Sequence, residues 1–152
     1  MCFQSIGSIP QKTENWKLDK LDKLDKLVKK IIYSDNAPKA IGTYSQAILA
    51  GKFLFISGQI GLDPATMKLV KGFEEETIQV FKNITSICEE AGYSINDVVK
   101  FNILLTDLSN FQKVNEIMES TLEKPYPARA AYEISSLPKN SSIEIESIAY
   151  KE

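Results

Sequence analysis

The stretch Ile143-Glu144-Ile145-Glu146-Ser147-Ile148-Ala149-Tyr150 is the most informative part of this sequence for the fold. Side chains alternate between the two faces of a sheet along an extended strand. One face then carries small and branched apolar side chains, which suit packing beneath a helix. The other face mixes two carboxylates, Glu144 and Glu146, with Ile148 and Tyr150. Such a face fits a subunit interface or a cleft wall, and equally an edge strand that is protected by its charges.

Hydrophobic periodicity predicts the other elements of an α+β domain. Alternating apolar runs and turn residues predict strands over 44–50, 53–57, 97–106, 128–134 and 142–150. Helical spacing predicts a helix over 73–91 and a second helix, capped by Ser109, that reaches Leu122. Cys88 lies on the apolar stripe of the first helix, so we expect an inert core thiol. The expected order is β-β-α-β-α-β-β.

Two helices are enough to cover only one face of such a sheet. The other face would be left open, and an open apolar face promotes aggregation. We therefore expect a barrel-like arrangement or an oligomer to cover it.

Composition excludes several classes of protein. The 152 residues, 43% hydrophobic and 25% charged, suit one soluble domain. A net charge of −2 argues against a strongly cationic nucleic-acid binder, and no apolar run reaches the length of a membrane span. The chain has no histidine and two cysteines, Cys2 and Cys88. These counts exclude Ser-His-Asp and Cys-His catalysis, imidazole-bound zinc and a disulfide framework.

Arg129 is the single arginine beside seventeen lysines. A guanidinium binds a carboxylate or phosphate through two parallel hydrogen bonds, which an ammonium group does not do. Arg129 is therefore a candidate anion-binding residue, although a lone arginine is also compatible with a surface position.

Residues 1–33 differ in composition from the rest of the chain. A three-residue repeat of Lys, Leu and Asp spreads its leucines around a helix because the helical turn has 3.6 residues. We predict a low-complexity charged extension over 1–33 and a folded domain over 34–152; the alternative is a helix that docks on the domain or on a partner. The segment has the pattern of neither a secretory signal nor a transit peptide, so we expect a cytoplasmic protein.

Six short motifs occur in order along the predicted domain, from Ser34 to the C-terminus. They are Asn36-Ala37-Pro38, Gly42-Thr43-Tyr44-Ser45-Gln46-Ala47, Phe55-Ile56-Ser57-Gly58-Gln59, Asp107-Leu108-Ser109-Asn110-Phe111, Pro127-Ala128-Arg129-Ala130-Ala131 and Ile143-Glu144-Ile145-Glu146-Ser147-Ile148-Ala149. Together they resemble the RidA/YjgF family of enamine and imine deaminases. Each motif alone is weak evidence, but six in the expected order are strong evidence.

The resemblance implies a chorismate-mutase-like fold with two helices on one face of the sheet. It implies a homotrimer whose sheets enclose a barrel-like core and whose active sites lie between subunits. The implied activity is hydrolysis of reactive 2-enamines and 2-imines, such as 2-aminoacrylate and 2-iminobutyrate, to 2-keto acids and ammonia. It implies no cofactor and no metal, in keeping with the missing histidines. The net charge and the lack of a long apolar run, noted above, argue against a nucleic-acid or membrane partner.

The resemblance also implies roles for three catalytic side chains. Arg129 would bind the substrate carboxylate through two parallel hydrogen bonds. Glu144 would position or deprotonate the attacking water, or move a proton between the enamine carbon and the imine nitrogen. Tyr44 would line the pocket and form a hydrogen bond to substrate or water. The alternatives are an interface ion pair between Arg129 and Glu144 or Glu146, and a purely core position for Tyr44.

Four further positions match substrate-binding positions of the family. They are Ser57, Gly58, Asn115 and Ala131. Ala131 stands where the family often has cysteine, so a thiol role is in doubt here. Ser57 and Gly58 are also compatible with a strand-end turn, and Asn115 with a helix cap or a solvent-facing position.

Two other functions remain open at this point. One is RNA cleavage or inhibition of translation, activities that have also been attached to similar proteins. The other is a non-catalytic, ligand-binding or chaperone-like trimer that uses the same clefts. Turnover separates the deaminase from the second alternative.

Overall fold

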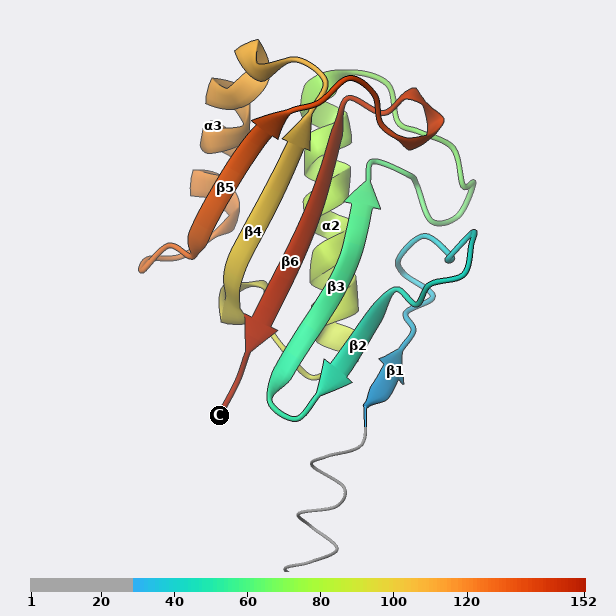
Figure 1. The fold of residues 1–152 in the computed structure, drawn as a ribbon, viewed down its shortest axis with the longest axis vertical. Coiled ribbons are helices and arrows are strands. Elements are labelled where there is room, and N and C mark those ends of the chain that lie inside the picture. The colour runs from blue at the N-terminus through green and yellow to red at the C-terminus, as the bar shows by residue number, and fades with distance from the viewer. Residues whose placement is uncertain (1–28) are drawn as a thin grey trace, which may run out of the picture.

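A six-stranded sheet with two helices packed behind it forms the part of the chain that the structure describes, residues 29–152 of a computed structural model (Figure 1). The strands are β1 Lys30–Ile32, β2 Ala47–Ala50, β3 Phe53–Ile60, β4 Val98–Leu105, β5 Ala128–Glu133 and β6 Ile143–Tyr150. The α-helices are α2 Phe73–Glu90 and α3 Phe111–Thr121, and the 3₁₀ turns are η2 Ile95–Asp97, η3 Leu108–Asn110 and η4 Pro138–Asn140. The Lys-Leu-Asp repeat, and so the alternative that it forms a docking helix, lies outside the described residues.

The sheet is mixed, with strand order β1-β2-β3-β6-β4-β5. Every neighbouring pair is antiparallel except β4 and β5, which are parallel. A parallel pair needs a crossover connection, and α3 lies within it. β6 lies between β3 and β4, so the edge-strand interpretation of its charged face is wrong.

The seven predicted elements all occur in the predicted order, and β1 is an eighth. It lies inside the range 1–33 that we assigned to the extension, whereas the structure places Lys30–Ile32 in the sheet, paired with β2. Ile32 is only 3% exposed. Three residues are too few to show a periodicity, so the sequence pattern did not reveal this strand.

The predicted cap of the second helix is also corrected. Asp107, not Ser109, supplies the capping side chain, because its carboxylate accepts a hydrogen bond of 2.9 Å from the Ser109 backbone N–H. This contact begins η3, which leads directly into α3. Asn110, which precedes α3, forms no side-chain cap hydrogen bond.

The core lies between the helices and the sheet. The apolar stripe of α2 is buried as predicted, and it includes Cys88, whose pKa burial raises to about 12. Ile143, Ile145 and Ala149 of β6 are fully buried beneath the helices. The alternation predicted for this strand is therefore confirmed.

The sheet face that points away from the helices is open in a single chain (Figure 1). Phe53, Phe55 and Tyr132 are each about half exposed on it, at 45%, 47% and 56%. The Phe53 ring packs 5.1 Å from that of Tyr150, centroid to centroid. This face is an apolar surface that a second chain would cover favourably. Within residues 29–152, no helix combines the length and apolarity that crossing a membrane requires.

Candidate active site

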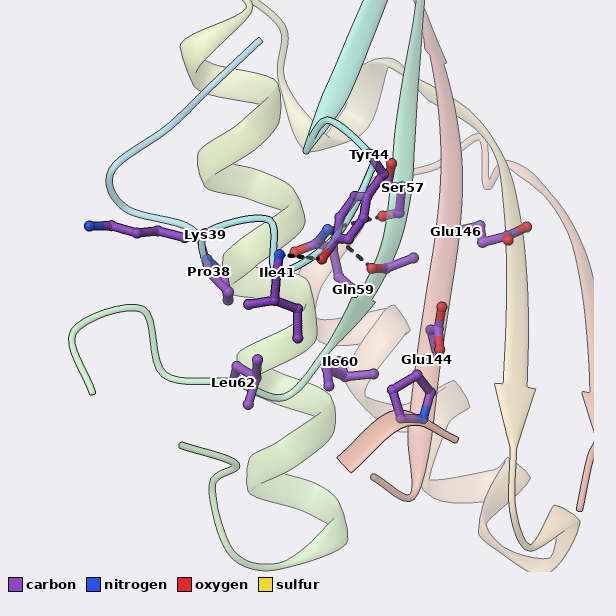
Figure 2. A pocket seen from close by; sticks show the side chains of 12 residues that line it. Pro38, Lys39, Ile41, Tyr44, Ser57, Gln59, Ile60, Leu62, Glu144 and Glu146 are labelled. Carbon is purple, nitrogen blue, oxygen red and sulfur yellow. Dashed lines mark hydrogen bonds between the residues drawn. The ribbon is translucent and has the colours of Figure 1, made fainter. Parts of the chain in front are cut away.

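A cavity of about 380 Å³ lies where the segment before β2 faces β3 and β6 (Figure 2). We call it the Tyr44–Glu144 cavity. Its lining residues are Pro38, Lys39, Ile41, Tyr44, Ser57, Gly58, Gln59, Ile60, Leu62, Pro138, Glu144 and Glu146. The cavity therefore combines an apolar wall with hydroxyl groups and two carboxylates.

Gly58 makes room for Glu144 in this cavity. The pairing of β3 with β6 is irregular between Ile56 and Gln59, so the strand bulges at Gly58. A Cβ atom placed on Gly58 would overlap Oε1 of Glu144. Only glycine leaves the carboxylate in its observed position, which gives the predicted residue Gly58 a steric role.

Gln46 holds the wall of the cavity that carries Tyr44. Its side chain is 2% exposed. Its Oε1 accepts a hydrogen bond of 2.7 Å from Ser34 N–H, and its Nε2 donates to the carbonyls of Ser34, Ala37 and Pro38 at 3.0, 3.2 and 2.8 Å. Gln46 belongs to one of the six motifs, but the sequence pattern does not reveal its role, because its partners lie up to twelve residues away.

Tyr44 and Ser57 place two hydroxyl groups in the cavity. The Tyr44 hydroxyl oxygen accepts a hydrogen bond of 3.4 Å from the Ile41 N–H, and the side chain is 47% exposed. The alternative of a core position for Tyr44 is therefore wrong. The Ser57 hydroxyl donates to the Ser45 carbonyl at 2.7 Å, which leaves its oxygen as an acceptor on the cavity side.

Glu144 is half-buried, and its environment favours the protonated form. Burial raises the pKa of the Glu144 carboxyl above its usual value of 4.5, and the negative charge of Glu146 raises it further. A carboxyl group whose pKa is moved toward neutrality is suited to accepting and returning a proton.

Charge in this cavity opposes an anionic ligand. Two of its lining residues are carboxylates, and the single lining cation is Lys39. Lys39 is exposed, and in Figure 2 its side chain points away from the cavity. Binding a carboxylate substrate here therefore requires a cation from elsewhere.

Arg129 lies on β5, in a second cavity of about 440 Å³. Its Nη1 donates to Asn115 Oδ1 at 2.6 Å and contacts Met118 Sδ at 3.4 Å. The guanidinium carbon lies 4.7 Å from the centroid of the Phe111 ring. Ala131 lines an adjoining hollow with Arg129 and Phe111. We call this group of Phe111, Asn115, Met118 and Arg129 the Arg129 cradle.

The structure divides the predicted site residues into two groups. Tyr44, Ser57, Gly58 and Glu144 share one cavity, whereas Arg129, Asn115 and Ala131 lie together at the other. Three strand spacings separate β3 from β5, roughly 14 Å. Arg129 pairs with the buried Phe101 and so faces the helix side, whereas Glu144 faces the open side. One chain alone therefore does not bring Arg129 to Glu144.

No ion pair within residues 29–152 involves a predicted site residue. Lys113 pairs with Glu74 and Glu116 on the exposed surface, and the described residues form no ion pair between Arg129 and either glutamate of β6. No group of three carboxylate or thiol side chains in this range is arranged to hold a metal ion.

Comparison with known proteins identifies the family. Residues 34–151 match the family model described as Endoribonuclease L-PSP. This chain belongs to that family, the RidA/YjgF family. The resemblance drawn from the six motifs is thereby confirmed.

Individual relatives of this RidA/YjgF chain are similar over nearly their whole length. A RutC family protein of Pyrococcus horikoshii is 53% identical over 126 residues, which are 82% of this chain and 100% of the relative. The human 2-iminobutanoate/2-iminopropanoate deaminase is 46% identical over 123 residues, 80% of this chain and 90% of the enzyme. The crystal structure of RidA from the Antarctic bacterium Psychrobacter sp. is 55% identical with a TM-score of 0.79, covering 80% of this chain and 99% of that one.

Proposed function

We propose that this RidA/YjgF chain hydrolyses 2-imino acids and their 2-enamine tautomers to 2-keto acids and ammonia, at sites shared between copies of the chain. The observation that carries the proposal is the separation of the two groups within one protomer. A carboxylate and a tyrosine lie in a cavity without an inward-pointing cation. The single arginine lies in a separate cavity, whose one carboxylate, Glu119, is exposed and forms no ion pair with Arg129 among the described residues. A small 2-imino acid needs both, because its carboxylate is bonded directly to the reacting carbon.

The open sheet face supports association of three copies. Half-exposed aromatic side chains make this face apolar, and covering it with the sheets of neighbouring copies removes that surface from water. In a closed ring, each copy presents its Arg129 cradle to the Tyr44–Glu144 cavity of the next copy. Each of the three interfaces then holds one complete site.

Arg129 binds the substrate carboxylate in this proposal. Its Nη1 is engaged by Asn115, so the edge formed by Nε and Nη2 receives the two carboxylate oxygens. Asn115 acts on the substrate through Arg129. Ala131, which has no thiol, contributes its backbone and the space beside the arginine.

Glu144 handles the proton of the attacking water. Water adds to the carbon of the protonated imine (C=NH₂⁺) and gives one proton to Glu144, and the product is a neutral carbinolamine. Glu144 returns that proton to the nitrogen, the C–N bond breaks with its electron pair leaving as ammonia, and the hydroxyl group gives its proton to the ammonia, which leaves the keto acid and ammonium. For an enamine, one proton is first delivered to the β-carbon, which makes the protonated imine. The Tyr44 and Ser57 oxygens lie where they can form hydrogen bonds to the water.

The test is release of 2-keto acid from 2-iminobutanoate generated in situ by a threonine dehydratase. We expect the wild-type chain to accelerate release and Arg129→Ala to lose at least about tenfold, because a charge-assisted, two-point contact is removed. A folded wild-type oligomer without acceleration would overturn the enzyme assignment and favour a trimer that only binds ligands.

A further inference from the structure

We propose that Phe111 is a positioning residue, whose ring holds the guanidinium of Arg129 in the orientation that receives the substrate carboxylate. The inference rests on the proposed function and deepens it, because it concerns how the anion-binding group is prepared before substrate arrives. The guanidinium carbon lies 4.7 Å from the centroid of the Phe111 ring, within the range of a cation–π contact.

Helix α3 presents the three contacts of the cradle along one stripe. Phe111, Asn115 and Met118 are spaced four and three residues apart, so their side chains lie on the same face of the helix. The ring contacts the guanidinium, Asn115 Oδ1 accepts a hydrogen bond from Nη1 at 2.6 Å, and Met118 Sδ lies 3.4 Å from the same nitrogen. The helix therefore contacts both the plane and one edge of the guanidinium group.

The remaining edge of the guanidinium group is available to a ligand. Within residues 29–152, the structure gives Nε and Nη2 of Arg129 no hydrogen-bond partner. These two N–H groups are parallel and match the two oxygens of a carboxylate. With Nη1 held by Asn115 and the plane held by Phe111, this edge is the one left for the substrate.

Holding the arginine in advance increases affinity for the substrate. Arg129 is exposed on an edge strand, and a long exposed side chain loses rotamer freedom when it binds a ligand. The Phe111 ring already restricts the Arg129 side chain in the free protein, so less rotamer freedom is lost when the ligand binds. Removing the ring should therefore raise KM and the Kd for the product, with little change in the rate of the bound complex.

A matched control separates this role from packing, since Phe111 also packs against the hydrophobic core. Phe73 is the first residue of α2, as Phe111 is of α3, and it too is partly buried against the core. Arg129 contacts the Phe111 ring and not that of Phe73. Phe73→Leu therefore removes an equivalent ring from an equivalent place.

The experiment compares Phe111→Leu, Phe111→Tyr and Phe73→Leu with the wild type. For Phe111→Leu we expect KM for 2-iminobutanoate to rise roughly threefold to thirtyfold, the range of a cation–π contact, with kcat within about twofold. Phe111→Tyr keeps a π face and should restore KM to near the wild-type value. Phe73→Leu should keep the wild-type KM, and melting temperatures of all variants report packing separately.

Titration calorimetry with 2-oxobutanoate supplies a second readout. Its Kd should rise in Phe111→Leu by the same factor as KM. The positioning role would be overturned if Phe111→Leu kept the wild-type KM and Kd. It would also be overturned if KM and Kd rose equally in Phe73→Leu. Either result would leave the proposed deaminase activity in place. Wild-type protein that binds 2-oxobutanoate without turning over the imine would overturn the proposed function alone, and the Kd series would still decide the role of Phe111.

Discussion

Two carboxylates on alternate positions of β6 set the electrostatics of the Tyr44–Glu144 cavity. Glu144 and Glu146 point to the same face of the strand, two residues apart, so the negative charge of Glu146 raises the pKa of Glu144. Burial acts in the same direction and is the larger cause of the raised Glu144 pKa. The proposed base therefore owes its proton affinity to its place in the sheet.

Neutralising Glu146 should shift the pH dependence of the reaction. Glu144 accepts a proton when ionised, so kcat/KM falls as pH drops through its pKa, which lies above 4.5. Glu146→Gln removes the repulsion and lowers that pKa, so activity should persist to lower pH. The measurement is the acid limb of the kcat/KM profile. Glu90→Gln, on the exposed end of α2, is the control and should leave the profile unchanged. If the acid limb stays in place in Glu146→Gln, the charge of Glu146 does not act on Glu144.

At the level of secondary structure, the bulge in β3 is what admits the Glu144 side chain. Gly58→Ala should therefore displace Glu144 and lower turnover sharply, whereas stability should change little, because the Glu144 side chain borders a cavity into which it can move. Initial rates and urea unfolding measure the two effects. Gly42→Ala is the control, because its Cβ would make only ordinary contact at 3.5 Å with the Tyr44 ring. Equal effects of the two substitutions would show that the close approach to Glu144 is unimportant.

Strand β1 predicts a difference between two truncations. Removing residues 1–28 takes away no contact that the structure describes, whereas removing residues 1–33 deletes β1 and its buried Ile32. Burial of one isoleucine contributes roughly 1.5–3 kcal/mol, so the longer truncation should lower the free energy of unfolding by about that amount. Urea unfolding of both proteins is the measurement. Equal stability of the two would mean that β1 contributes nothing to the domain.

At the scale of the whole molecule, the Tyr44–Glu144 cavity and the Arg129 cradle are separated within one chain. An arginine on β5 that faces the helices and a carboxylate between β3 and β4 that faces the open side do not meet in one chain. In the proposed trimer, the apolar open face favours association of the chains, and association brings Arg129 of one copy to the cavity of the next. Assembly and catalysis are then linked in the proposed trimer.

Mixing two inactive variants tests this link directly. When Arg129→Ala and Glu144→Gln copies are co-expressed and assort at random in a ring, about one site in four combines both native residues. We expect that fraction of wild-type activity in the mixed oligomer and almost none in either variant alone. Light scattering should give an oligomer mass three times the 17.0 kDa of one chain. Inactive mixed oligomers would place both residues of a site in the same copy.

Sequence patterning was sufficient for most of the fold. The buried stripe of α2, the alternation along β6 and the order of seven elements follow from spacings of two and 3.6 residues, which are local properties. The motifs were likewise sufficient to identify the family and to propose residues for its site. β1, the Asp107 cap and the role of Gln46 were missed, because they depend on partners or on segments too short for a pattern.

The distribution of the site over two groups required the tertiary structure. Arg129 and Glu144 are fifteen positions apart in the sequence, yet β4 separates their strands and they face opposite sides of the sheet. Strand order and the bulge at Gly58 determine that arrangement, and both arise from pairing between distant segments. Spacing along a chain specifies which face a side chain takes within its own strand. Which strand lies beside it is decided by the free energy of packing the whole sheet against its helices.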